Sequence, residues 1–178
     1  MSDAVIHDFG ESLKKSHEQE DAEWWEPAYR KAFCGFASMS SVRTDGWAQR
    51  GGIDRVITLK SGKVLYVDEK VRDSDWPDIL FERWSDAERR TPGWIQKDLA
   101  CDYIAYAFIP SKTCYLLPFL QMRKAWVVNG KAWIEKAFAK ADGFRVVNAR
   151  NKTYTTQSIA VPIPEALHCI QEAMIVGW

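Results

Sequence analysis

The segment GGIDRVITLKSGKVLYVDEKVR, residues 51–72, decides the fold. Two runs rich in Val, Ile, Leu and Tyr flank a Lys-Ser-Gly-Lys turn, which is typical of a β-hairpin. Acids are poor strand formers and are costly to bury unpaired, yet Asp54 begins the first run and Asp68-Glu69-Lys70 ends the second. The sequence therefore predicts that a positive charge compensates these acids, and we expect a divalent metal ion.

The length of the turn determines which side chains share a face of the hairpin. A two-residue loop would put Asp54 opposite Glu69. A three-residue loop ends on Gly62, at a position that favours a left-handed residue, and puts Asp54 opposite Asp68. Lys70 then shares their face, because side chains alternate along a strand. We favour the three-residue loop, since only this register brings the two acids and the lysine together.

Two carboxylates that face each other across a sheet repel, and a divalent cation between them reverses that interaction. Oxygen ligands suit Mg²⁺, with Mn²⁺ as a substitute, so Asp54 and Asp68 are predicted metal ligands. Lys70 would hold an attacking water or stabilise charge on a phosphate. Glu69 is expected on the opposite face near Arg55, with its backbone carbonyl as a further metal contact. The alternative is that both aspartates only cap turns or pair with neighbouring basic residues.

An acid at the start of one strand, a hairpin and an acid-x-Lys at the end of the next strand resemble the PD-(D/E)XK nuclease superfamily. Asp54, Asp68 and Lys70 match its motif, while Ile53 replaces the proline and the second acid is Asp instead of the commoner Glu. The resemblance extends over roughly residues 20–110 and is to phage or resolvase-like members. It implies a restriction-endonuclease-like core.

The resemblance also implies two further site residues. Members often draw an acid from the helix before the core, which makes Glu26 the candidate here, with Glu23 behind it. Some members carry a glutamine after the core strands, and Gln96 matches that position. Two ordinary interpretations stay open: Glu26 pairs with Arg30 one helical turn away, and Gln96 is a surface helix residue.

Apolar periodicity predicts one α/β domain over residues 1–178, with a central mixed β-sheet flanked by helices. Both faces of the hairpin are otherwise apolar, which predicts an interior position in that sheet. Helices are expected at 18–36 with Pro27 in the first turn, at Gln96–Cys101, at 120–140 with a break at Asn129-Gly130, and at 164–175. Further strands are expected at 78–85, 102–109, 113–119, 143–150 and 155–163, and a loop at 37–52.

Charge is distributed unevenly along the chain, although the formal net charge is zero. Residues 1–28 hold eight acids and two lysines, a net of −6, so the remainder is +6. An acidic N-terminal segment, 1–20, on a basic body is compatible with an anionic partner such as DNA. Ordinary solvated faces would give the same count.

The four cysteines lie far apart and form no C-x-x-C pair, which argues against a zinc site. We expect reduced thiols in a cytoplasmic protein. The chain shows no signal-peptide pattern and no apolar run of membrane-spanning length, so no membrane partner is expected.

Together these observations predict a magnesium-dependent nuclease that hydrolyses phosphodiester bonds in DNA. The alternative is a catalytically inactive nuclease-fold module that binds nucleic acid or a host protein. A homodimer is compatible with either function.

Overall fold

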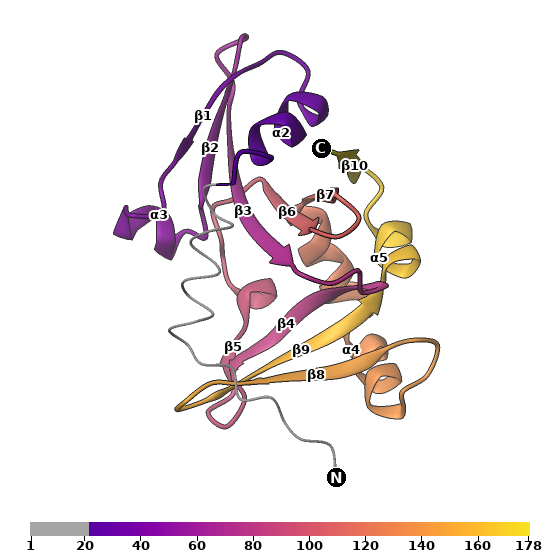
Figure 1. The fold of residues 1–178 in the computed structure, drawn as a ribbon. Coiled ribbons are helices and arrows are strands. Elements are labelled where there is room, and N and C mark those ends of the chain that lie inside the picture. The colour runs from indigo at the N-terminus through magenta and orange to yellow at the C-terminus, as the bar shows by residue number, and fades with distance from the viewer. Residues whose placement is uncertain (1–21) are drawn as a thin grey trace. The chain divides into compact units, whose positions relative to one another are not determined.

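The computed structural model describes residues 22–178, which form two compact α/β units (Figure 1). Within the described residues, the hairpin unit comprises residues 22–76, Asp98–Met122 and Leu167–Trp178. The second unit comprises Pro77–Lys97 and Arg123–Ala166 within the described residues. The expectation of a single domain stays a prediction. The acidic segment 1–20 lies outside the described residues.

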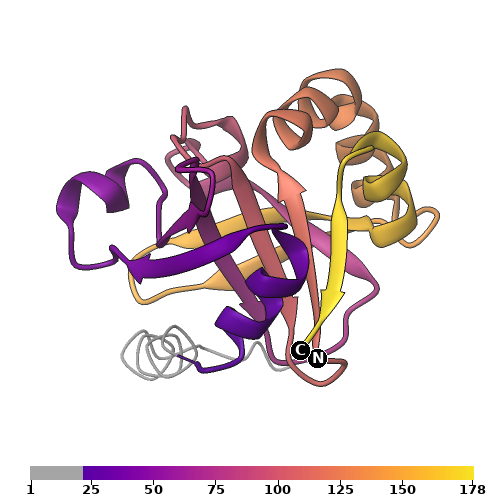
Figure 2. The same ribbon diagram turned by 90° about the horizontal axis from the view of Figure 1, so that it is seen from above.

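The hairpin unit is built on a curled, six-stranded mixed sheet (Figure 2). Strands β3 and β6 are parallel, and the other neighbours are antiparallel. The expected α/β class with a mixed sheet is therefore confirmed. The strand order is β1 (Phe36–Ser41), β2 (Arg55–Leu59), β3 (Val64–Arg72), β6 (Tyr103–Phe108), β7 (Thr113–Pro118) and β10 (Met174–Gly177).

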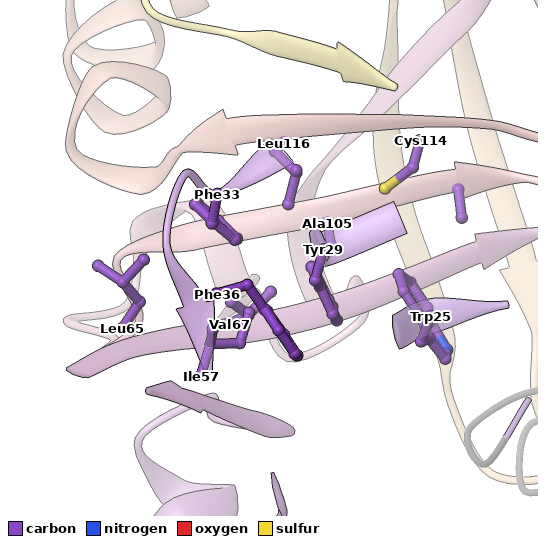
Figure 3. Packing of buried hydrophobic residues seen from close by; sticks show 11 residues of the cluster. Trp25, Tyr29, Phe33, Phe36, Ile57, Leu65, Val67, Ala105, Cys114 and Leu116 are labelled. Atoms are coloured by element: carbon purple, nitrogen blue, oxygen red, sulfur yellow. The ribbon is translucent and has the colours of Figure 1, made fainter. Parts of the chain in front are cut away.

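Helix α2 (Trp25–Ala32) covers one face of this sheet (Figure 3). Its side chains Trp25 and Tyr29 are fully buried against strand residues that include Val67 and Leu116. Pro27 lies in the first turn, as predicted, where its missing N–H costs no helical hydrogen bond. The packing fixes the α2-facing side of β3, and alternation along the strand assigns every second residue to the other face.

The hairpin adopts the predicted three-residue register. Arg55 pairs with Val67, and the Leu59 N–H donates to the Lys63 carbonyl at 2.8 Å. Gly62 has φ of +83°, the left-handed conformation that this turn position favours. Asp54 and Asp68 are therefore opposite each other at the end of the antiparallel ladder.

Strands β2 and β3 are interior strands, as expected, but the hairpin is not buried on both faces throughout. Val64 and Tyr66, on the face away from α2, are 41% and 37% exposed. These residues lie toward the turn, so the tip of the hairpin projects into solvent on that side.

The second unit contains an antiparallel sheet of its own. The sequence predicted one central sheet and did not separate these strands from those of the hairpin unit. Phe81 of this sheet packs on Trp126 and Trp133 of helix α4 (Phe119–Ala139). The strand order is β5 (Thr91–Pro92), β4 (Asp78–Asp86), β9 (Thr155–Pro162) and β8 (Arg145–Arg150). The short helix η1 (Trp94–Gln96) follows β5 along the chain, and α5 (Ile163–Cys169) follows β9.

Several expected elements differ in the structure. The segment expected to be a loop, 37–52, contains strand β1 and the short helix α3 (Gly46–Arg50), which Asp45 caps by accepting from the Trp47 and Ala48 N–H groups. The strand expected at 78–85 forms as β4 but belongs to the second sheet. The short helix expected at Gln96–Cys101 is one turn that ends at Gln96.

The helical boundaries also need correction. Helix α4 runs unbroken through Asn129-Gly130, where the Asn129 side chain donates to the Ala125 carbonyl one turn earlier at 3.2 Å. The closing helix ends at Cys169 instead of 175, because Met174–Gly177 forms β10 and pairs with β7.

Two further expectations concern thiols and membranes. All four cysteines lie within the described residues and are free thiols. None of the helices in residues 22–178 is long and apolar enough to cross a membrane.

Candidate functional site

Asp54 lies at the point where the chain enters β2, beside the later half of β3. Its backbone N–H donates to the Val67 carbonyl at 2.9 Å, and its Oδ2 accepts from the Glu69 backbone N–H at 2.8 Å. These two contacts fix the Asp54 carboxylate against β3. Its side chain is 21% exposed and remains open to solvent.

Asp68 faces Asp54 and is nearly enclosed, with a side chain that is 6% exposed. Burial raises the pKa of Asp68 to about 7, the Lys70 ammonium opposes that rise, and the Asp54 carboxyl adds to it through its charge and a side-chain hydrogen bond. The Asp54 carboxyl is therefore close enough to influence the ionisation of Asp68. A pair of this kind is unfavourable when both groups are ionised and no cation lies near them.

Lys70 lies two residues beyond Asp68 and on the same face of β3, as predicted. Its Nζ is 2.6 Å from Asp68 Oδ1, and its side chain is 33% exposed. The ammonium therefore contacts the buried acid and solvent at once. This position suits a group that must reach an incoming anion without leaving the carboxylate pair.

Glu69 points to the opposite face, where its carboxylate is fully buried. It accepts from the Tyr29 hydroxyl at 2.7 Å, from Arg55 Nε at 3.0 Å and from Arg43 Nη2 at 2.6 Å. The expected pairing with Arg55 is confirmed. These three hydrogen bonds give the Glu69 side chain a structural role. The metal contact through the Glu69 backbone carbonyl stays a prediction.

Arg43 connects the two faces and was missed as a site neighbour in the sequence. Besides its bond to Glu69, its Nη2 lies 3.7 Å from Asp54 Oδ2. It follows β1, whose Ser41 pairs with Arg55. Reading FASMSS as an edge strand beside β2 would have brought Arg43 to the acids, but the small polar side chains of that strand hide its pattern.

The two residues implied only by the resemblance have other partners. The Glu26 carboxylate accepts from Arg30 Nε at 2.8 Å on the exposed side of α2, which is the ordinary helical pairing. Glu23 is exposed in the turn before that helix. Gln96 belongs to the second unit, where its amide donates to the Arg83 carbonyl. A catalytic role for Glu26 or Gln96 stays a prediction.

The donors at the Asp54–Asp68 pair fit a hard divalent cation. Both residues offer carboxylate oxygens, the ligand class that Mg²⁺ prefers, and their mutual repulsion in a buried position would be relieved by a cation. Burial, followed by the Asp68 charge, raises the pKa of Cys101 to about 12, so this neighbouring thiol stays neutral and is a poor ligand. Within residues 22–178, no three His, Cys, Asp or Glu side chains are grouped so that they could hold a metal ion.

Comparison with known proteins identifies no relative of this chain. No protein-family model, curated protein or solved structure matches the chain.

Proposed function

We propose that the chain is a magnesium-dependent nuclease that hydrolyses phosphodiester bonds in DNA, with the hairpin unit as a restriction-endonuclease-like core. One observation supports this function above the others. Asp54 and Asp68 face each other across β2 and β3, with the Lys70 ammonium beside them. Paired carboxylates followed by a lysine form the arrangement expected for metal-assisted attack on a phosphodiester.

Each residue has a distinct role in this proposal. Asp54 and Asp68 would hold Mg²⁺ or Mn²⁺, which when bound supplies Lewis-acid polarisation of the phosphodiester and lowers the pKa of a coordinated water. Lys70 orients the attacking water or stabilises negative charge on the phosphate, as its partly exposed ammonium allows. The buried Glu69 keeps β3 in register through its bonds to Tyr29 and Arg55.

A second candidate is a nuclease-fold module that binds nucleic acid or a protein without catalysis. The favouring observation is that both aspartates have structural partners: Asp54 accepts a backbone N–H from β3, and Asp68 pairs with Lys70. Asp54, Asp68 and Glu69 are also matched in number by three cations, which are Arg43, Arg55 and Lys70. This balance would keep the acids in place even if no chemistry were performed.

Cleavage of supercoiled plasmid, with Mg²⁺ and with a chelator, tests the nuclease. Lys70→Ala should lower the cleavage rate by about 10²–10⁴, the usual loss when a positioned catalytic group is removed. Its DNA affinity in chelator should stay near that of the wild type. Lys63→Ala, at an exposed position of the same hairpin, is the matched control and should cleave normally.

Three results would contradict the proposal. They are cleavage that persists in chelator, full activity of Lys70→Ala, and equal losses in Lys70→Ala and Lys63→Ala. A purified wild type that binds DNA and does not cut it with Mg²⁺ or Mn²⁺ would favour the binding module.

A further inference from the structure

The second unit contains an open groove of about 610 Å³. This volume lies within the range of roughly 300–1,000 Å³ that is typical of small-molecule sites. One wall is a face of α4, because its lining residues recur every three or four positions from Arg123 to Glu135. The other walls come from β4 and η1. We call this feature the α4 groove.

Aromatic rings form the base of the α4 groove. Trp126 lines it and stacks on the buried Phe81, with ring centroids 6.1 Å apart and an interplanar angle of 10°. Trp84 also lines it, and the Arg83 guanidinium lies 5.0 Å from the Trp84 ring centroid. Flat indoles held by packing are platforms on which a nucleobase can stack, whatever its sequence.

Gly130 lies against the Trp126 ring in the α4 groove. It lies inside the 21-residue helix α4, where glycine is less favourable than alanine. A Cβ at this position would lie 3.1 Å from Trp126 Cδ2. The bare backbone therefore lets the indole lie against the helix, and this close approach supplies a physical reason for a glycine there.

The charges of the α4 groove favour an anion. Three cations line it, Arg83, Arg123 and Lys131, against one acid, Glu135. Lys131 and Glu135 are exposed, whereas Arg83 and Arg123 are half-buried. A ligand with an aromatic ring and a phosphate would match both the base of the groove and this excess of positive charge.

We propose that the α4 groove binds a nucleobase together with its phosphate. The base stacks on the tryptophan platform, and the phosphate contacts the basic residues. A free nucleotide and a segment of single-stranded nucleic acid share this chemistry. The site goes beyond the proposed phosphodiester hydrolysis, because it shares no residue with the Asp54–Asp68 pair and needs no metal.

Binding is measured by the fluorescence anisotropy of a labelled oligothymidylate at low salt in chelator, where no metal-dependent cleavage can occur. Unlabelled thymidine monophosphate should compete for the site. Thymidine and inorganic phosphate should each compete at least tenfold more weakly, because each lacks one half of the recognised group. An oligonucleotide that binds far more tightly than the monophosphate identifies a strand as the ligand, whereas similar affinities identify a free nucleotide. Either pattern supports the site.

Two variants locate the binding. Lys131→Ala should weaken it and reduce the slope of log K against log salt by about 0.7, the value for one lost phosphate contact to a single strand. Lys124→Ala, also exposed on α4 but outside the groove, is the control. Gly130→Ala should weaken binding about tenfold by displacing Trp126 into the groove.

The site is overturned if neither probe binds, if thymidine competes as well as its monophosphate, or if Lys131→Ala and Lys124→Ala behave alike. Binding by the α4 groove without any cleavage in Mg²⁺ would refute the proposed nuclease activity and support the proposed binding site. Normal cleavage, together with binding that is insensitive to Lys131→Ala and Gly130→Ala, would refute the binding site and leave the proposed nuclease activity supported.

Discussion

Asp68 is an acid buried beside another acid, and this makes stability depend on pH in an unusual direction. Most carboxyl groups have a lower pKa in the folded state and stabilise the fold as pH rises. The pKa of Asp68 is instead raised, from the ordinary 3.8 to about 7. The folded state therefore holds a proton that the unfolded state has already released between these two values, and stability falls as pH rises through that window.

We predict that the metal-free wild type loses stability relative to Asp68→Asn between pH 4 and pH 7, with no further relative change above pH 7. Asparagine imitates the protonated acid, so the variant lacks this proton linkage. The difference should be on the order of a few kcal/mol, since one pKa unit corresponds to about 1.4 kcal/mol. Urea unfolding in chelator at several pH values measures it. A difference that is constant across this range would mean that Asp68 titrates normally.

At the scale of elements, the hairpin shows what sequence reasoning could obtain. Two arguments favoured the correct register: Gly62 in the last loop position suits a left-handed backbone without cost, and only this loop length brings Asp54, Asp68 and Lys70 to one face. Local turn chemistry is strong enough here to determine the geometry of a pair that is distant in sequence.

The same glycine gives an element-scale prediction. Gly62→Ala should destabilise the protein by about 1–2 kcal/mol, the cost of a left-handed conformation for a residue with a Cβ. Apart from the two neighbouring residues, no heavy atom lies within 4 Å of the position that the Cβ would occupy, so the loss would come from backbone strain alone. Ser61→Ala in the same turn should be nearly neutral. Denaturant unfolding of both variants checks this, and a stable Gly62→Ala would mean that the turn can adopt another loop type.

Other elements could not be found from local pattern because tertiary pairing decides them. Half of the residues of strand β1 are serines, the strand lies on a sheet edge, and it forms because β2 provides a partner. Helix α4 tolerates Asn129-Gly130 since Trp126 packs over the glycine. Residues 174–177 continue an apolar pattern that suits a helix, yet they form strand β10 by pairing with β7. Arg43 was missed for the same reason, because its approach to Asp54 depends on β1.

At the scale of the whole molecule, metal binding should appear as added stability. A ligand that binds only the folded state stabilises it by RT ln 11, about 1.4 kcal/mol, at ten times its dissociation constant. For a chain of this size, that raises the melting temperature by roughly 2–6 °C. Thermal melts of the wild type in chelator and in millimolar Mn²⁺ measure the shift.

Asp54→Asn separates a metal ligand from a structural acid in the same experiment. If the proposal holds, the variant loses the Mn²⁺ response and is no less stable in chelator, since one of two repelling charges is gone. Its side-chain oxygen can still accept from the Glu69 N–H. If Asp54 serves structure alone, the variant is destabilised and Mn²⁺ has no effect on either protein.

Charge gives a second prediction at this scale. Residues 29–178 carry a net charge of +6, so DNA binding in chelator should weaken as salt rises, because phosphate contacts release counterions. Affinity measured at several salt concentrations gives the slope. An affinity that is independent of salt, or none at all, would favour a protein partner.

The parallel pairing of β3 with β6 has a consequence for how the chain assembles. The two strands are separated in sequence by residues 73–102, so a long loop must close before their contacts form. Until then, one edge of β3 is unpaired and is a template for pairing with another chain. Asp68, Glu69 and Lys70 lie in this strand, and charged side chains discourage such intermolecular pairing. The acids and lysine of the candidate site would thus also protect the nascent sheet from aggregation.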